Sequence, residues 1–332
     1  MNSMTSWEIV DAERTDSLWD QVCEQSEAAT FFHTKTWADV IARTFPQWIA
    51  EPMVRKFSDG NIMVLPLMRR KGIVRHYYES LPPGVYGGPL FLEAPSEYQT
   101  QRTLAALNEF PSIIVCGNPF AEMNFDDVHR REMHTHILDL RIGSDGIEKR
   151  FRKGHRANIS VASRKGVEIT IASKPAEVDS YFDVYRNSLA RWGETATGFY
   201  PKRLFHNLFQ VADNGQKIKL WLAKYNGQVV AGAWIFYHGG HAVYWHGAMY
   251  ADYMHCHPVH LMLSDAIKAA CEDGFRWFDF NPSGGLQGVE HFKRGFGAEC
   301  RAFAGYRRLG PIGKAYRAKR YFKEAVLRTC PV

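Results

Sequence analysis

The segment from residue 167 to residue 281 contains strand-like and helix-like stretches in an order that occurs in few folds. Apolar residues at every second position indicate the strands, and apolar residues at a spacing of three or four indicate the helices. Asn226-Gly227 is the strongest short hairpin signal in the chain, and Gly239-Gly240 marks a second turn. The predicted order is strand 167–172, helices 175–190 and 201–211, strands 217–224, 228–237 and 241–248, helix 258–272 and strand 277–281. This half therefore contains an antiparallel meander followed by a helix and a further strand.

That order resembles the core of the GNAT acyltransferases, and the first half can be interpreted in the same way. Its predicted elements are strands 6–10, 112–116 and 134–140, helices 15–24, 34–44 and 96–110, and strands 47–57 and 61–68 around Ser58-Asp59-Gly60. A chain of 332 residues fits two domains of ordinary size. We expect an α/β (α+β) fold of two tandem GNAT-like domains, with mixed, largely antiparallel sheets. The predicted divisions are 1–140, 141–310 and a basic amphipathic C-terminal helix, 311–332.

The positive charge is confined to two short segments. The net charge of the chain is +6. Residues 301–332 contain nine Lys and Arg residues and one acidic residue. Residues 141–166 contain eight Lys and Arg residues and two acidic residues, so the rest of the chain has a net negative charge. Apolar residues at helical spacing between Ile147 and Ala162 predict one basic helix that ends at Lys165-Gly166. Such clusters favour a polyanionic partner, such as the phosphates of a nucleotide sugar, RNA or an anionic lipid.

Three further stretches resemble motifs of the FemAB-type acyltransferases. They are FFHTKTWADV (31–40), HRANISVASRKGVEIT (155–170) and WFDFNPSGGLQGVEHFKRGFGAE (277–299), and the last is the most specific. The resemblance covers about residues 6–310. It implies one of two activities. The first is transfer of an amino acid from aminoacyl-tRNA to a lysine side chain of a peptidoglycan precursor. The second is acyl-CoA-dependent or unassigned N-acyl transfer, often in polysaccharide or lipid biosynthesis.

The resemblance also implies functional residues. Phe292 and Lys293 correspond to a Phe-Lys pair that lines the catalytic channel of the family, and Tyr244 or His246 falls near a channel tyrosine. Arg156 and Arg164 correspond to the segment that contacts acceptor phosphates. The predicted catalytic residues are Lys293, Phe292, Asp279, Tyr244 and His246, and the predicted substrate-binding residues are Arg156, Arg164, Lys35 and Trp245.

Each of these residues also has a structural interpretation. Lys293 is either an electrostatic stabiliser or a solvated lysine at a helix end. Asp279, placed between aromatic residues, is either a base of raised pKa or a buried carboxylate bonded to loop backbone. Glu290 and His291 are either general bases or surface residues. His255-Cys256-His257 with His260 has poor spacing for tetrahedral zinc, so no metal is predicted.

The predicted co-substrate is aminoacyl-tRNA, with no bound cofactor, and the acceptor is a phosphate-bearing small molecule or lipid-linked precursor. Residues 250–262 contain no Gly, whereas a Gly-rich loop there holds the CoA pyrophosphate in ordinary GNAT enzymes. Acyl-CoA is therefore the alternative donor, and a non-catalytic binding module on the same fold is the second alternative.

We expect a cytoplasmic protein, because the chain has no secretory signal, no run of 18 apolar residues and no regular cysteine spacing. The basic tail has three interpretations. It docks on the protein's own core, lies peripherally on the anionic inner face of a membrane, or holds tRNA phosphates.

Overall fold

A computed structural model describes residues 7–9, 12–71, 77–82, 85–121, 123–125, 128–192, 199–212 and 217–318. The chain forms two compact units. Among the described residues, the first comprises those up to Met133 and those from Ala302 onward, and the second comprises those from His134 to Arg301. The chain leaves the first unit within strand β9 (Arg130–Asp139) and returns to it within strand β15 (Glu299–Leu309).

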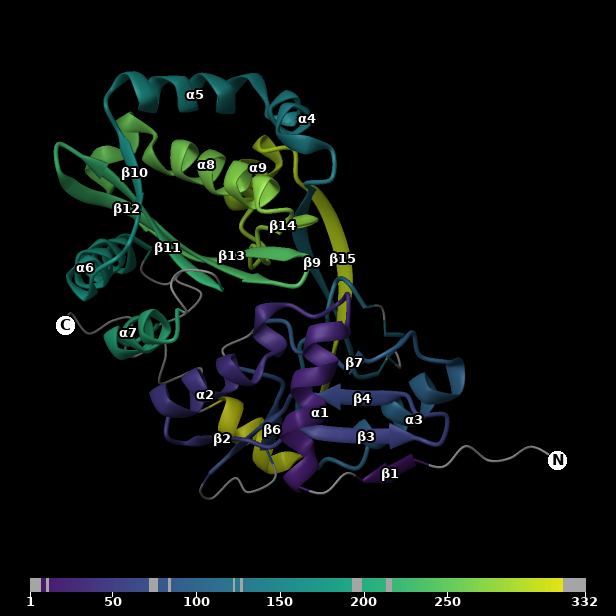
Figure 1. Ribbon diagram of the computed structural model, residues 1–332. Helices are drawn as coiled ribbons and strands as arrows, with labels where there is room; N and C mark the ends of the chain where they lie inside the picture. Colours follow the sequence, from purple (N-terminus) through teal and green to yellow (C-terminus); the bar gives the residue numbers. More distant parts are fainter. Residues whose placement is uncertain are drawn as a thin grey trace. The chain divides into compact units, whose positions relative to one another are not determined.

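The second unit contains a sheet with the strand order β10-β11-β12-β13-β14-β9 (Figure 1). All neighbouring strands are antiparallel except β13 and β14, which are parallel. The further strands are β10 (Glu168–Ile171), β11 (Ile218–Tyr225), β12 (Gln228–His238), β13 (His241–Met249) and β14 (Trp277–Asp279). Asn226 and Gly227 both have positive φ, at 50° and 77°, as a two-residue hairpin requires. The predicted meander is confirmed.

Helices cover both faces of this sheet. Figure 1 shows α6 and α7 on one face and α5 and α8 on the other. The bounds are α4 (Gly143–Arg150), α5 (Lys153–Arg164), α6 (Pro175–Trp192), α7 (Lys202–Gln210), the 3-10 helix η4 (Ala251–Cys256), α8 (Pro258–Glu272) and α9 (Gln287–Gly295). The predicted helix 258–272 coincides with α8, which begins at Pro258 because proline is favoured in the first turn.

The prediction of one continuous basic helix was wrong. The chain is extended at Phe151, with ψ 129°, so α4 and α5 are separate helices. Phe151 leaves the helical path to bury its ring edge-on against Phe296 at 5.2 Å. The Arg152 N–H donates to the Gly295 carbonyl at 2.9 Å instead of to a helical partner. Tertiary packing thus outweighs the helical spacing here, while Gly166 ends α5 as expected with φ 78°.

The first unit contains two strand groups, ordered β1-β3-β4-β7 and β15-β8-β6-β5-β2. Its helices include α2, whose N-cap is the predicted Thr34: the hydroxyl accepts from the Trp37 N–H at 3.3 Å. The helices are α1 (Ala12–Gln25), η1 (Phe31–His33), α2 (Lys35–Thr44) and α3 (Glu97–Leu107). The strands are β1 (Trp7–Ile9), β2 (Trp48–Ala50), β3 (Met53–Phe57), β4 (Ile62–Leu65), β5 (Met68–Arg70), β6 (Tyr77–Glu79), β7 (Leu90–Phe91) and β8 (Ser112–Val115).

The two long strands predicted at 47–57 and 61–68 are each divided in two. The hairpin between β3 and β4 is present, but β2 and β5 pair with each other in the other sheet. Pro52 and Pro66 lie at the two breaks. Proline has no N–H to donate to a ladder, so each strand ends before it and resumes in a different sheet.

The start of the basic tail forms a helix over residues 311–318 that packs on the first unit. The Tyr316 ring meets the Tyr77 ring edge-on at 4.8 Å, and the Arg70 guanidinium lies 4.6 Å from the Tyr316 ring centre. Gly313 is buried, and a Cβ there would overlap Ser112. Ile312, predicted on the apolar stripe, is 62% exposed because the helix docks through Gly313 and Tyr316. Docking is thus confirmed for 311–318, and residues 319–332 lie outside the described residues.

No helix in the described ranges combines the length and the apolar character needed to cross a bilayer. Cys23, Cys116, Cys256, Cys271 and Cys300 are all free thiols.

Substitution of two glycines of α9 by alanine is expected to have opposite effects on stability. A Cβ at Gly295 would overlap the imidazole ring of the buried His155, whereas a Cβ at Gly288 would meet nothing within 4 Å. We expect Gly295→Ala to lower the free energy of unfolding by roughly 1–3 kcal/mol through overpacking. Gly288→Ala is the matched control and should raise that free energy by about 0.5–1 kcal/mol. Urea unfolding measures both, and equal effects would contradict the close packing of α5 and α9.

Candidate functional site

The candidate site lies where the two parallel strands of the second unit stop pairing. β13 and β14 pair over three positions only, and the last pair is Val243 with Asp279. β13 continues to Met249, whereas β14 ends and Asn281 takes a left-handed conformation with φ 62°. The residues after the last pair, Tyr244 and Phe280, have rings in edge contact at 6.4 Å. The pairing of the two strands therefore ends here while β13 continues, and we call this point the strand opening.

A β-bulge in β13 re-aims side chains next to this opening. Tyr244 pairs with Ile235 and His246 pairs with Trp234, so Trp245 is the extra residue of the bulge. Tyr244 passes over Gly247, where a Cβ would overlap the tyrosine side chain. Burial raises the pKa of Tyr244 to about 12, so the phenol keeps its proton and is a hydrogen-bond donor near neutral pH.

Lys293 is a buried lysine and not a solvated one. It is only 4% exposed, and its Nζ donates to the Asn281 carbonyl at 2.6 Å. Burial lowers the pKa of Lys293 to about 8, while the charges of Asp279 and Glu290 act in the opposite direction. A lysine with a pKa near 8 exchanges its proton close to physiological pH, which an ordinary surface lysine does not do.

Asp279 is fully buried at the end of β14. Its Oδ1 accepts from the Thr135 hydroxyl at 2.7 Å and from the Asn281 N–H at 2.8 Å. These contacts are the ones expected of a carboxylate that bonds to loop backbone. Asp279 thus holds the turn that carries the Asn281 carbonyl and also provides the negative charge that acts on Lys293.

Polar residues that the sequence analysis did not select complete the cluster. The Arg294 Nε donates to His136 Nε2 at 3.3 Å, and burial, followed by Lys293 and Arg294, lowers the pKa of His136. Three buried polar atoms, His136 Nδ1, Asn281 Oδ1 and Ser283 Oγ, have no hydrogen-bond partner among the described residues. Buried polar groups are normally satisfied, so these atoms are candidates to contact a substrate.

Phe292 joins α9 to helices α5 and α8. Its ring lies 5.4 Å from that of His155 and 5.1 Å from that of His260, and its carbonyl accepts from His155 Nε2 at 2.9 Å. Glu290 is half-buried and acts on the charge of Lys293, whereas His291 is exposed. Phe292 therefore fixes the position of the helix that carries Lys293.

His246 and Trp245 lie in an aromatic cluster with α6 and α7. The Tyr181 hydroxyl and His246 Nδ1 are 2.5 Å apart, and burial lowers the pKa of His246 to about 3. His246 is therefore neutral at physiological pH. Tyr200 and Phe205 approach the Trp245 ring at 5.1 and 6.3 Å. The structure thus separates the two candidates for the channel tyrosine: Tyr244 stands beside the strand opening, and His246 bonds to α6.

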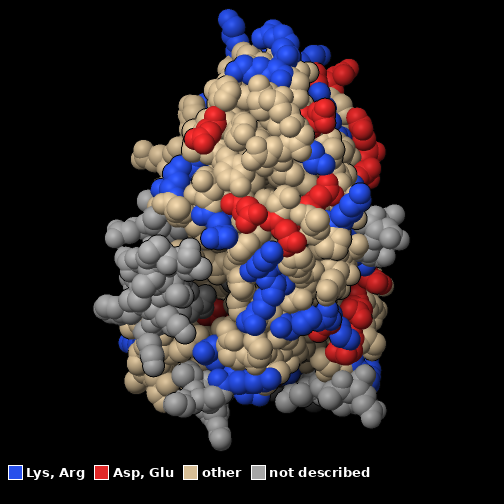
Figure 2. All heavy atoms as spheres, turned by 90° about the vertical axis from the view of Figure 1, so that its left-hand side faces the viewer, with Lys and Arg blue, Asp and Glu red and all other residues tan. Residues whose placement is uncertain are grey.

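Arg156 and Arg164 are both exposed on α5. Figure 2 shows Lys and Arg gathered over the end of the unit where Figure 1 places this helix. Arg156 Nη1 donates to the Phe151 carbonyl, so this guanidinium also closes the C-terminal end of α4. Lys35 lies in the first unit, where it forms a 2.5 Å ion pair with Asp16. Lys35 is therefore not among the side chains that the second unit brings together.

The histidine-rich segment before α8 has structural partners. His255 Nε2 and Cys256 Sγ are 3.1 Å apart, and the His255 carbonyl accepts from Lys165 Nζ at 2.8 Å. Within the described ranges no group of three or more His, Cys, Asp and Glu side chains is placed to hold a metal ion.

Comparisons with known proteins give the family of this unit. Residues 149–294 match the family model described as "Acetyltransferase (GNAT) domain". The second unit is therefore similar to GNAT acetyltransferase domains over the matched residues. This match confirms the expectation of an acyltransferase, and the elements around the strand opening, from α5 to Arg294, fall within the matched residues.

Solved structures show a similar fold over nearly the whole chain. The structure titled "Crystal structure of FemX" has a TM-score of 0.69 at 12% identity, and the match covers 93% of this chain and 99% of that chain. The C-terminal domain of a putative lysylphosphatidylglycerol synthetase from Agrobacterium fabrum has a TM-score of 0.52 at 12% identity, with coverages of 93% and 96%. L-PGS from Bacillus licheniformis has a TM-score of 0.51 at 14% identity, with coverages of 91% and 93%.

These likenesses confirm the expected FemAB-type, GNAT-related fold. No curated protein sequence matches the chain.

The lowered pKa of Lys293 predicts a pH dependence of stability. The unfolded chain binds this proton up to about pH 10.5 and the folded protein only up to about pH 8. Between these values the unfolded state holds more protons, so the free energy of unfolding rises with pH. We expect the wild-type protein to gain about 2 kcal/mol relative to Lys293→Met between roughly pH 7.5 and pH 9.5. Urea unfolding at both pH values measures the difference, and a constant difference would exclude a perturbed Lys293.

Proposed function

We propose that the protein transfers an aminoacyl group from aminoacyl-tRNA to an amine of a nucleotide- or lipid-linked acceptor, and that the reaction takes place at the opening between β13 and β14. The observation that carries this proposal is the buried Lys293, held by the Asn281 carbonyl and balanced by Asp279, at the strand opening of a GNAT domain. The similarity of fold to FemX and to lysylphosphatidylglycerol synthetase favours an aminoacyl group over an acetyl group.

The chemistry needs a cation where charge develops. The neutral acceptor amine attacks the ester carbonyl of the donor, a C–N bond forms, and the carbonyl oxygen becomes negative. Collapse of this intermediate breaks the ester C–O bond, the amine loses a proton, and the ribose oxygen of the tRNA gains one. The Lys293 ammonium stabilises the oxyanion or supplies the proton to the leaving oxygen, and a pKa near 8 suits both tasks.

The other residues have supporting roles in this proposal. Tyr244 keeps its proton and donates a hydrogen bond at the strand opening. Asp279 is a positioning residue, because it acts through Lys293 and the Asn281 turn. Phe292 orients α9, Trp245 and His246 form the wall toward α7, and Arg156 and Arg164 contact acceptor phosphates from α5.

The N-terminal end of α8 supports tRNA over CoA as the donor. A CoA pyrophosphate needs several free N–H groups of an open, glycine-rich turn at this place. Here Pro258 has no N–H, and the N–H groups of His257 and His260 donate to the Met254 and His257 carbonyls. Beside this turn, Lys165 Nζ donates a hydrogen bond to the His255 carbonyl. Two N–H groups at the start of α8 therefore already donate to backbone carbonyls, and Pro258 offers none.

A direct assay tests the reaction and the role of Lys293. The protein is incubated with a pool of charged tRNAs and a nucleotide-linked peptidoglycan precursor that carries a free amine, and products are read by mass spectrometry. We expect one aminoacyl group added per acceptor, and a loss of at least about a hundredfold in kcat for Lys293→Met. Lys174→Met, an exposed lysine on the same unit, is the control and should retain full activity.

Acyl-CoA remains the alternative donor, since the family model describes an acetyltransferase domain. Thermal stabilisation of the protein by CoA, together with acyl transfer from acyl-CoA and none from tRNA, would replace the tRNA proposal by this alternative. Absence of transfer from both donors would favour the non-catalytic binding module.

The contact between Gly247 and Tyr244 gives a second test of the site. An added methyl group at Gly247 displaces the tyrosine ring that lies over it. We expect Gly247→Ala to lower kcat about tenfold or more while KM changes little, because the hydroxyl then misses its place at the strand opening. Gly288→Ala, at an open position of α9 where φ is not positive, tests whether the effect is particular to Gly247. If Gly247→Ala has the wild-type kcat, Tyr244 takes no part in the reaction.

A further inference from the structure

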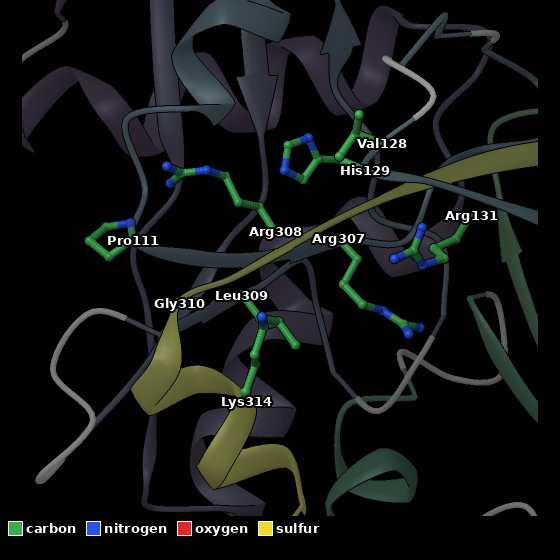
Figure 3. A pocket seen from close by; sticks show the side chains of 9 residues that line it. All are labelled: Pro111, Val128, His129, Arg131, Arg307, Arg308, Leu309, Gly310 and Lys314. Carbon is green, nitrogen blue, oxygen red and sulfur yellow. The ribbon is translucent and has the colours of Figure 1, made fainter.

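A second candidate binding site lies entirely within the first unit, on residues that acyl transfer does not use. A pocket of about 370 Å³ is formed where β15 ends, the helix 311–318 begins and β9 starts. Its volume corresponds to about a dozen water molecules and falls in the range of small-ligand sites. The residues that line it are Pro111, Val128, His129, Arg131, Arg307, Arg308, Leu309, Gly310 and Lys314 (Figure 3).

The polar lining of this pocket is cationic. Arg131, Arg307, Arg308 and Lys314 contribute four positive charges, and the lining residues include no carboxylate. In the described part of the chain, none of these four side chains forms an ion pair. Arg308 instead donates to the Phe110 carbonyl, which holds its guanidinium in place. The pocket therefore gathers positive charge that the described protein groups do not neutralise.

Two arginines of the pocket act on each other. Arg307 and Arg308 are neighbours on β15 and point to opposite sides of the strand, and Figure 3 shows Arg131 on the side of Arg307. Burial, followed by the charges of Arg317 and Arg131, lowers the pKa of Arg307 from its ordinary value, while Tyr77 and Glu79 act in the opposite direction. Arginine keeps its proton in any case, so this repulsion is a cost that a bound anion would remove. The buried Arg307 Nε has no hydrogen-bond partner among the described residues.

The hydrogen-bond donors and the apolar residues of the pocket indicate which type of anion it would bind. Guanidinium groups present paired N–H donors that match phosphate oxygens, and Arg131 and Arg307, on the same side of β15, provide one such group for each phosphate of a pyrophosphate. Pro111, Leu309 and the 77% exposed Val128 provide an apolar wall beside the cations. A pyrophosphate group with an attached organic group fits this combination better than an isolated phosphate.

We propose that this pocket binds the pyrophosphate group of a small molecule, with a nucleoside diphosphate or inorganic pyrophosphate as the source. The site is distinct from the proposed phosphate contacts on α5 and from Lys35, because none of those residues lines it. Binding here depends only on the first unit and not on the proposed transfer reaction.

Calorimetric titration of the full chain with inorganic pyrophosphate and, separately, with uridine diphosphate tests the proposal at low salt. We expect saturable binding of at least one probe and a Kd about tenfold or more higher for Arg131→Gln, an exposed side chain whose loss leaves the fold intact. Arg130→Gln is the matched control: it removes the same charge from the preceding residue of β9, which does not line the pocket. Its Kd should stay close to that of the wild-type protein.

The two probes distinguish the source, since tighter binding of uridine diphosphate indicates that the apolar wall holds the nucleoside. Three results would overturn the proposal. The first is no binding of either probe, and the second is equal weakening by Arg130→Gln and Arg131→Gln. The third is binding of uncharged tRNA alone, which would make the pocket a contact for the RNA backbone. Thermal unfolding of each variant confirms that it is folded before titration.

Discussion

The buried carboxylate of Asp279 is the constraint on which the candidate site depends. It lies at the last paired position of β14, between β13 and β9, and cannot be solvated by water there. Its hydrogen bonds to Thr135 and to the Asn281 N–H connect β9 to the turn after β14. The same turn presents the Asn281 carbonyl to Lys293, whose buried charge Asp279 helps to stabilise. Burial of one acid thus determines the positions of a turn, a helix and a lysine.

The charged and titratable side chains differ in character between the two units. In the second unit a few titratable groups are buried and their pKa values move toward neutrality, as for Lys293, or far below it, as for His246. In the first unit the cations around Arg307 stay charged and lie close together without ion-pair partners among the described residues. The first arrangement suits proton exchange during a reaction, and the second suits the binding of an anion.

Local sequence signals were sufficient for most elements of the second unit. Asn226-Gly227, Gly166 and Pro258 define turns or helix ends through backbone preferences, and these act over a few residues whatever surrounds them. The Phe-Lys pair and Asp279 were candidates from the sequence, because they belong to the stretch that resembles the family motif. Thr135, His136 and Arg294 were not found, since each becomes part of the site only through partners more than a hundred residues away in the chain.

The sequence alone therefore determined the meander, the order of its helices and the residue types of the site. The tertiary structure decided where regular elements stop. Phe151 leaves its helix to pack on Phe296, and residues 302–318 return to the first unit. It also decided that Lys293 is buried and that the basic residues at 307, 308 and 314 share a pocket with Arg131. Burial and the meeting of distant segments are properties of packing, and no local pattern of residues encodes them.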